Sequence, residues 1–268
     1  MTRVLSGAAL VILAVAVVWF ASPLVFLAAA EALLILALVE YVSLARAHHL
    51  DVAVWPVGAA AVLAGATFSR VALGGISLAT APLDVVLLSA MIAVGALSLP
   101  RWRGGADALP QAAATVLPLF YLALPIGALI AVREMRGPQG LFLLMLTVMV
   151  SDTAQYYTGR MFGRRLLAPA ISPKKTVEGA VGGFVFGTAL LAVVGQWWLP
   201  GVPLSLRILL GAAIVALGIA GDLFESMLKR SAGVKDSSAL IPGHGGVLDR
   251  IDALLFAAPV YYIVLKYV

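Results

Sequence analysis

The sequence contains no cysteine, and only 12% of its 268 residues are charged. The lack of cysteine excludes disulfide bonds, a thiolate nucleophile and thiolate-bound zinc or iron–sulfur clusters. Charge this sparse, beside 62% hydrophobic residues and a mean hydropathy of +1.05, cannot cover the surface of a water-soluble globule. The sequence therefore predicts an all-α integral membrane protein that crosses the bilayer several times.

Long apolar segments follow one another along most of the chain. We expect nine transmembrane helices because each segment approaches the roughly 20 residues that span a bilayer. The third and fourth could instead be re-entrant or half-buried. The segments are 1–20, 22–43, 51–68, 80–99, 112–132, 139–158, 178–199, 204–228 and 251–267. The polar linker at 100–110 separates a motif-poor N-terminal region, 1–105, from a C-terminal region, 106–268, that holds nearly all the chemistry.

The basic residues are distributed unevenly between the two predicted sides of the membrane. With nine spans, thirteen of the eighteen Lys and Arg residues share the side of the amino terminus. The positive-inside rule then places that side, with the polar loops 159–177 and 229–250, in the bacterial cytoplasm. Because these residues lie in short loops, the net charge of +5 favours an anionic membrane face or a phosphorylated substrate over nucleic acid.

Two glutamates interrupt the second apolar segment. Glu40, next to Tyr41 and Arg46, is expected at the lipid-headgroup interface. Glu31 lies nine residues earlier, on the opposite face of the helix. We expect Glu31 to be a paired or protonated carboxylate inside the helix bundle.

The second half opens with polar residues at the end of the sixth segment. Asp152, Tyr156, Gly159 and Gly163 follow helical spacing and form one polar stripe. Asp152 could pair with a neighbouring cation or contact a substrate, and the spacing does not decide between these roles.

The segment SPKKTVEG, residues 172–179, follows this stripe. Either Ser172 caps a helix that begins at Pro173, or Thr176 caps the next helix. Lys174 and Lys175 then project near free backbone N–H groups, which is a reasonable cradle for phosphate. The alternative is a basic loop that only anchors the chain at the membrane surface.

The stretch from Gly221 to Asp252 has five acidic and four basic residues, a histidine and five glycines. Asp222, Glu225, Ser226 and Lys229 are spaced to line one face of a helix end. The glycine-rich turn at 243–246 can present backbone N–H groups, and Asp249 and Asp252 begin the last helix, where the dipole favours carboxylates. Carboxylates that can hold a hard cation, beside cations that neutralise phosphate, are what metal-assisted phosphoryl or nucleotidyl transfer requires.

Three runs in this stretch resemble the signature of the phosphatidate cytidylyltransferase, or CDP-diacylglycerol synthase, family. They are SMLKR at 226–230, KD at 235–236 and IPGHGGVLDRID at 241–252, and together they extend over 27 residues without a gap. The segments around Asp152 and at 172–179 are also similar to that family. The chain departs from the family pattern at Gln155, where a small residue is common.

The resemblance implies that CTP reacts with phosphatidic acid in the lipid bilayer to give CDP-diacylglycerol and pyrophosphate. The lipid phosphate is itself the nucleophile, so no protein nucleophile is needed. Asp222 and Asp249 are expected to share a Mg²⁺ centre, with a monovalent cation such as K⁺ as an optional neighbour.

The remaining polar residues receive roles from the same resemblance. Cations are expected to neutralise phosphate charge, and the 172–179 segment is expected to complete the pocket. The phosphate-neutralising cations are Lys229, Arg230 and Lys235, and the pocket residues are Ser172, Lys174, Lys175 and Thr176. The other ligands are expected to be oriented by Asp236, Arg250 and Asp252. His244 donates to a phosphate, acts in proton transfer or stabilises the turn.

Other functions are compatible with parts of the pattern. A related enzyme could act on another lipid phosphate, such as an isoprenoid glycerol phosphate. An ion-coupled transporter would also place carboxylates and glycine-broken helices in a membrane, although no inverted repeat is visible. A prenyltransferase is disfavoured because paired DDxxD motifs are absent. The resemblance leaves a homodimer open.

Overall fold

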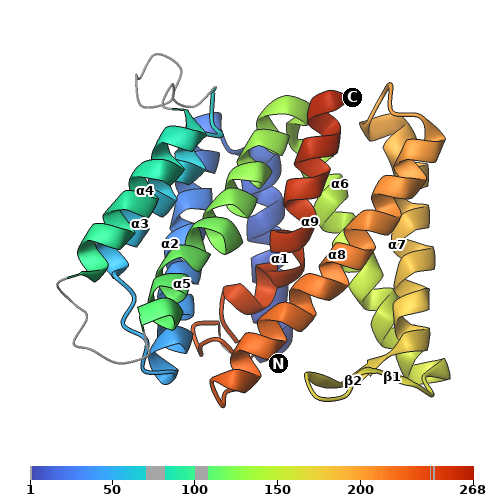
Figure 1. The fold of residues 1–268 in the computed structure, drawn as a ribbon. Coiled ribbons are helices and arrows are strands. Elements are labelled where there is room, and N and C mark those ends of the chain that lie inside the picture. The colour runs from blue at the N-terminus through green and yellow to red at the C-terminus, as the bar shows by residue number, and fades with distance from the viewer. Residues whose placement is uncertain (1, 71–81, 100–107, 242, 244) are drawn as a thin grey trace.

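The computed structural model describes residues 2–70, 82–99, 108–241, 243 and 245–268. The fold is a helical bundle with one small hairpin (Figure 1), so the predicted all-α class is confirmed. The α-helices are α1 (Thr2–Phe20), α2 (Pro23–Ala47), α3 (Val54–Ala66), α4 (Leu83–Ser98), α5 (Ala108–Pro118), α6 (Leu124–Phe162), α7 (Val177–Trp198), α8 (Leu204–Ser231) and α9 (Leu248–Tyr267). A π-helical turn, η2 (Leu119–Ala123), joins α5 to α6, and strands β1 (Leu166–Ala168) and β2 (Ser172–Thr176) form the hairpin.

Four stretches of helix in the described part of the chain are long and apolar enough to cross a membrane. They are α2, the continuous stretch Ala108–Phe162, α7 and α8. Shorter apolar helices occupy Gly7–Phe20, Val54–Ala66 and Leu83–Leu97. The prediction of a membrane protein is thereby confirmed, whereas the number of nine spans stays a prediction.

The fifth and sixth predicted segments correspond to one helical stretch that is broken at Gly137. Its φ of 68° lies in the left-handed region that glycine tolerates best, and Pro138 follows it directly. The chain reverses direction at this point (Figure 1), since Arg133 donates to the carbonyl oxygen of Val18 and Phe142 packs against neighbouring Trp19. The expected separation between 132 and 139 is this reversal.

Helices in the second half approach one another closely at glycines. A Cβ on Gly179 of α7 would lie 2.8 Å from the carbonyl oxygen of Gln155 in α6. A Cβ on Gly221 of α8 would lie 2.5 Å from the carbonyl oxygen of Asp252 in α9. Small residues at helix interfaces are typical of membrane bundles. These contacts hold α6, α7, α8 and α9 together around the polar segments.

The hairpin that joins α6 to α7 corrects part of the prediction for residues 172–179. Ser172 lies in β2, paired with Ala168, so the expected helix beginning at Pro173 is wrong. Thr176 does cap the next helix, since its Oγ1 accepts a hydrogen bond from the Gly179 N–H at 3.1 Å. Extended backbone suits Ser172 through Thr176 because β1 supplies the ladder partners.

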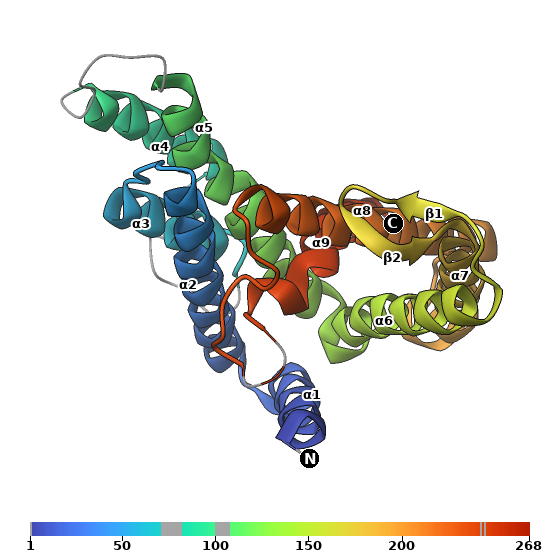
Figure 2. The same cartoon turned by 90° about the horizontal axis from the view of Figure 1, so that it is seen from below.

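The amino terminus and the hairpin lie at one end of the bundle, and the carboxyl terminus lies at the other (Figure 1). Seen from below, the hairpin lies next to α7 and α8 (Figure 2). Glu178 anchors this region, because its Oε2 accepts hydrogen bonds from the backbone N–H groups of Arg164 and Arg165 at 2.9 and 3.2 Å. The fold thus brings the segment before α7 to the charged end of α8.

Candidate active site

The last three turns of α8 carry a polar face that points into the bundle. Ser226 Oγ donates to Asp222 Oδ1 at 3.3 Å, and Lys229 Nζ lies 2.5 Å from Glu225 Oε2. Glu225 is fully buried, and Lys229 is 8% exposed. Burying both charges is tolerable because each has an ionic partner.

Asp249, at the start of α9, connects this face to the loop between α8 and α9. Its Oδ1 pairs with Lys229, and its Oδ2 accepts hydrogen bonds from Ser237 N, Ser237 Oγ and Gly246 N at 2.9, 2.8 and 2.7 Å. Burial raises the pKa of Asp249, but the contact with Lys229 and the hydrogen bonds from Gly246 and Ser237 outweigh burial and lower this pKa to about 2. Asp249 is therefore ionised at neutral pH, and its ion pair is lost only as the pH falls toward that value.

The hairpin contributes a cation to the same region. Lys175 Nζ, on β2, lies 2.5 Å from Asp222 Oδ2 on α8. The two side chains are 20% and 32% exposed, whereas the Lys175 Nζ atom itself is buried. The fold thereby brings together two predicted site residues that are 47 positions apart in the sequence.

A second group of carboxylates surrounds Asp222. Asp152 of α6 and Asp252 of α9 both lie close enough to Asp222 to interact with it electrostatically. Gln155, where the chain departs from the family pattern, donates to Asp152 Oδ1 at 3.0 Å. Carboxylate oxygens are the hard donors that Mg²⁺ prefers, so the donor chemistry around Asp222 fits the predicted ion.

The geometry at Asp249 is less favourable than that around Asp222 for a Mg²⁺ ion shared by the two residues. Both of its oxygens already accept hydrogen bonds, and Asp222 is paired with Lys175. Among the residues that the structure describes, no group of three or more His, Asp or Glu side chains is arranged to hold a metal ion. A Mg²⁺ ion held by Asp222 and Asp249 together would therefore have to displace Lys229 from Asp249 Oδ1.

The ion-paired residues form the charged cluster, which comprises Lys175, Asp222, Glu225, Lys229 and Asp249. The remaining predicted site residues that the structure describes are exposed or partly exposed. Lys174, Arg230, Lys235, Asp236 and Arg250 are exposed, and Ser172 and Thr176 are partly exposed in or beside the hairpin. Arg230 Nη1 donates to the carbonyl oxygen of Val234 at 3.0 Å, which folds the loop back on the end of α8. His244 lies outside the described residues.

Glu40 of α2 belongs to the site, although the sequence did not indicate its contacts. It is 4% exposed, and neighbouring Tyr41 is also buried, donating to the carbonyl oxygen of Ala114 at 2.9 Å. The expected position of Glu40 at the headgroup interface stays a prediction. The Glu40 carboxylate contacts Ser237, Ser238 and the beginning of α9. A glutamate within an apolar segment was the available signal, because a buried carboxylate needs partners.

Tyr121 is a second residue that the sequence did not single out. It lies in the π-helical turn, where Leu124 N–H bonds to Leu119 O because Pro125 cannot donate the next α-helical bond. Its ring packs against Phe224 with centroids 5.1 Å apart. The buried Tyr121 hydroxyl has no hydrogen-bond partner in the described part of the chain. The N-terminal half thus borders the charged cluster at two places.

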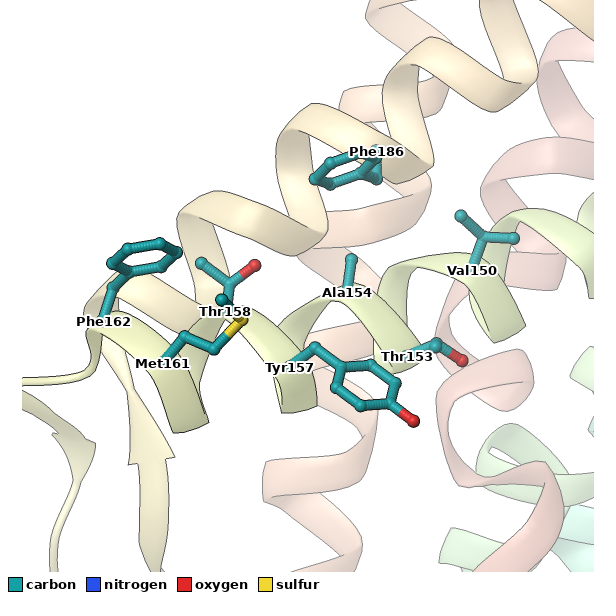
Figure 3. A pocket seen from close by; sticks show the side chains of 8 residues that line it. All are labelled: Val150, Thr153, Ala154, Tyr157, Thr158, Met161, Phe162 and Phe186. Carbon is teal, nitrogen blue, oxygen red and sulfur yellow. The ribbon is translucent and has the colours of Figure 1, made fainter.

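An apolar cavity of about 460 Å³ lies between α6 and α7 (Figure 3). Asp152 lies on the opposite face of α6, because successive helical residues are rotated by about 100°. The cavity is therefore separate from the charged cluster. Its lining residues are Val150, Thr153, Ala154, Tyr157, Thr158, Met161, Phe162 and Phe186.

Comparison with known proteins identifies several relatives of the chain. The chain is 36% identical to the phosphatidate cytidylyltransferase of Thermotoga maritima over 192 residues, covering 70% of each protein. It is 36% identical to that of Pseudomonas aeruginosa over 203 residues, covering 75% of this chain and 73% of the relative. It is 42% identical to that of Aquifex aeolicus over 147 residues, which is 55% of this chain and about half (54%) of the relative. The model of the cytidylyltransferase family matches residues 1–268, and the chain therefore belongs to that family.

Proposed function

We propose that the protein transfers the cytidylyl group of CTP to phosphatidic acid, giving CDP-diacylglycerol and pyrophosphate for phospholipid synthesis. The observation that carries this proposal is the convergence of Lys175, Asp222, Lys229 and Asp249 from three separate segments. The names of the relatives support the same reaction. A phosphate-rich substrate pair needs both cations and acidic groups of this kind.

In the proposed reaction, a phosphate oxygen of phosphatidic acid attacks the α-phosphorus of CTP. A new P–O bond forms there, and the bond from the α-phosphorus to the oxygen that bridges it to the β-phosphorus breaks, so pyrophosphate leaves. The exposed cations Lys174, Arg230 and Lys235 are suited to hold the triphosphate, because they are accessible from outside the bundle. Lys175, held by Asp222, is placed to bind a reacting phosphate.

Mg²⁺ is part of the proposal, with Asp222 and Asp249 as the residues that would hold it and Asp152 and Asp252 as nearby carboxylates. When bound, such an ion neutralises phosphate charge and stabilises the leaving pyrophosphate. The residues of the chain then orient the two substrates. A monovalent cation such as K⁺ beside this site remains part of the expectation.

We place the site at the cytoplasmic face of the bacterial inner membrane. This orientation can be tested because the natural chain has no cysteine, so a single introduced cysteine can be labelled specifically. We expect Ala170→Cys, in the exposed hairpin turn, to react with a membrane-impermeant maleimide in inverted vesicles but not in intact spheroplasts. Pro200→Cys, exposed in the turn between α7 and α8, should show the opposite pattern. The reverse result for the two positions would contradict the proposed orientation.

The proposed reaction is tested by incubating detergent-purified protein with CTP, Mg²⁺ and dioleoyl phosphatidic acid. We expect CDP-diacylglycerol and pyrophosphate in equal amounts. An isoprenoid glycerol phosphate in place of phosphatidic acid tests the alternative lipid substrate. If folded protein gives product only with the isoprenoid lipid, the substrate assignment is wrong. Product with neither lipid would overturn the proposed function.

A further inference from the structure

We infer that Glu40 is a positioning residue for the active site, acting as a clamp that holds the loop between α8 and α9 in its working conformation. Four hydrogen bonds support this role. Glu40 Oε2 accepts from Ser237 Oγ and Leu248 N at 2.9 and 2.8 Å, and Oε1 accepts from Ser238 Oγ and Val247 N at 2.7 and 2.9 Å. All four donors belong to the loop or to the beginning of α9.

Glu40 provides hydrogen-bond acceptors for backbone N–H groups at the amino terminus of α9. Val247 occupies the N-cap position of α9, and no side chain of its own caps the helix. The first backbone N–H groups of a helix need acceptors, and negative charge is favourable at that end of the helix dipole. Glu40 satisfies the N–H groups of Val247 and Leu248 from another helix, 207 and 208 positions away.

The effect of Glu40 reaches the charged cluster through Ser237. Ser237 Oγ lies 2.9 Å from Glu40 Oε2 and 2.8 Å from Asp249 Oδ2, so this hydroxyl lies between the two carboxylates and donates its single proton to one or the other. Asp249 in turn pairs with Lys229. Glu40 therefore fixes the position of a predicted site residue without belonging to the C-terminal half that carries the motifs.

The fit between clamp and loop is close at Gly246. A Cβ on Gly246 would lie 2.4 and 2.5 Å from the two Glu40 oxygens and 2.2 Å from Ser237 Oγ. Real Cβ atoms do not approach other heavy atoms this closely, so the loop reaches the glutamate only because residue 246 is glycine. This contact gives a physical reason for a glycine at the last position of the GHGG turn.

The test compares Glu40→Gln with Glu31→Gln, which removes the other carboxylate of α2. Among the residues that the structure describes, the buried Glu31 oxygens have no hydrogen-bond partner, so Glu31→Gln breaks no such contact. For Glu40→Gln, the amide nitrogen must face at least one N–H donor. We expect the KM for CTP to rise about 10- to 100-fold, the range seen when residues that orient ligands are lost. A smaller fraction of folded protein would lower the rate but would leave this KM unchanged.

A second measurement does not depend on activity. Trypsin cleavage after Lys235, which is exposed in the clamped loop, should be faster in Glu40→Gln than in the wild type and unchanged in Glu31→Gln. Equal KM and equal cleavage in Glu40→Gln and the wild type would overturn the inference, as would equal changes in both variants. The KM comparison rests on the proposed function. If the wild type does not turn over CTP, that function fails, and the cleavage comparison still decides the role of Glu40.

Discussion

The Asp249→Asn protein is expected to form CDP-diacylglycerol at least about 10³-fold more slowly than the wild type, as when a preorganised charge contact is lost from an active site. An asparagine cannot satisfy the surroundings of Asp249 in either amide orientation. With its oxygen toward Ser237 and Gly246, the amide nitrogen faces the ammonium of Lys229, and in the other orientation it faces the backbone donors. Lys229 would retain only Glu225 as its ionic partner.

The rates should be measured on purified protein in detergent, with thermal unfolding of each sample recorded beside them. Asp84→Asn is the matched control, because Asp84 is an exposed aspartate in the first turn of α4. We expect this control to retain the wild-type rate. We also expect Asp249→Asn to remain folded despite a lower unfolding temperature, since one partner of a buried ion pair is lost. More than about a tenth of the wild-type rate in Asp249→Asn would remove Asp249 from the reaction, because that loss is only about 1.4 kcal/mol.

Asp222→Asn is expected to lower turnover by about 10²-fold and to raise the Mg²⁺ concentration needed for half-maximal rate. Asparagine can still accept the hydrogen bond from Ser226, so the packing of α8 is kept. Without the charge of Asp222, the carboxylate group that it forms with Asp152 and Asp252 attracts a Mg²⁺ ion less strongly. The measurement is a Mg²⁺ titration of the initial rate at saturating CTP.

Lys175→Met distinguishes the contribution of Asp222 to Mg²⁺ binding from its ion pair with Lys175. The substitution breaks the same 2.5 Å contact but leaves every carboxylate in place. We expect a higher KM for phosphatidic acid or CTP and an unchanged Mg²⁺ requirement. If both variants shift the Mg²⁺ requirement equally, Asp222 acts only as the partner of Lys175.

Local patterns were sufficient to predict much of the second half. The spacing of Asp222, Glu225, Ser226 and Lys229 fixes a common face because α8 is a regular helix there. The N-cap at Thr176 was one of the two local alternatives for the segment before α7. Apolar length and composition were enough for the membrane class, because both depend on single segments rather than on how segments pack.

The sequence could not reveal contacts between distant segments. Glu40 reads locally as a charge beside an aromatic residue, and its partners lie about 200 residues later. The hairpin at 166–176 was missed because its two strands have only three and five residues and no alternation of polar and apolar side chains. The pairing of Lys175 with Asp222 depends on that hairpin, so it could not be predicted either.

The most direct test of the proposed reaction follows two labels of CTP in one experiment. Purified protein is incubated with phosphatidic acid, Mg²⁺ and CTP that carries ³²P on either the α- or the γ-phosphorus. Cytidylyl transfer predicts that the α label moves into the lipid extract, while the γ label remains in water as pyrophosphate. Label from the γ-phosphorus in the lipid, or no label in the lipid from either CTP, would contradict cytidylyl transfer by this protein.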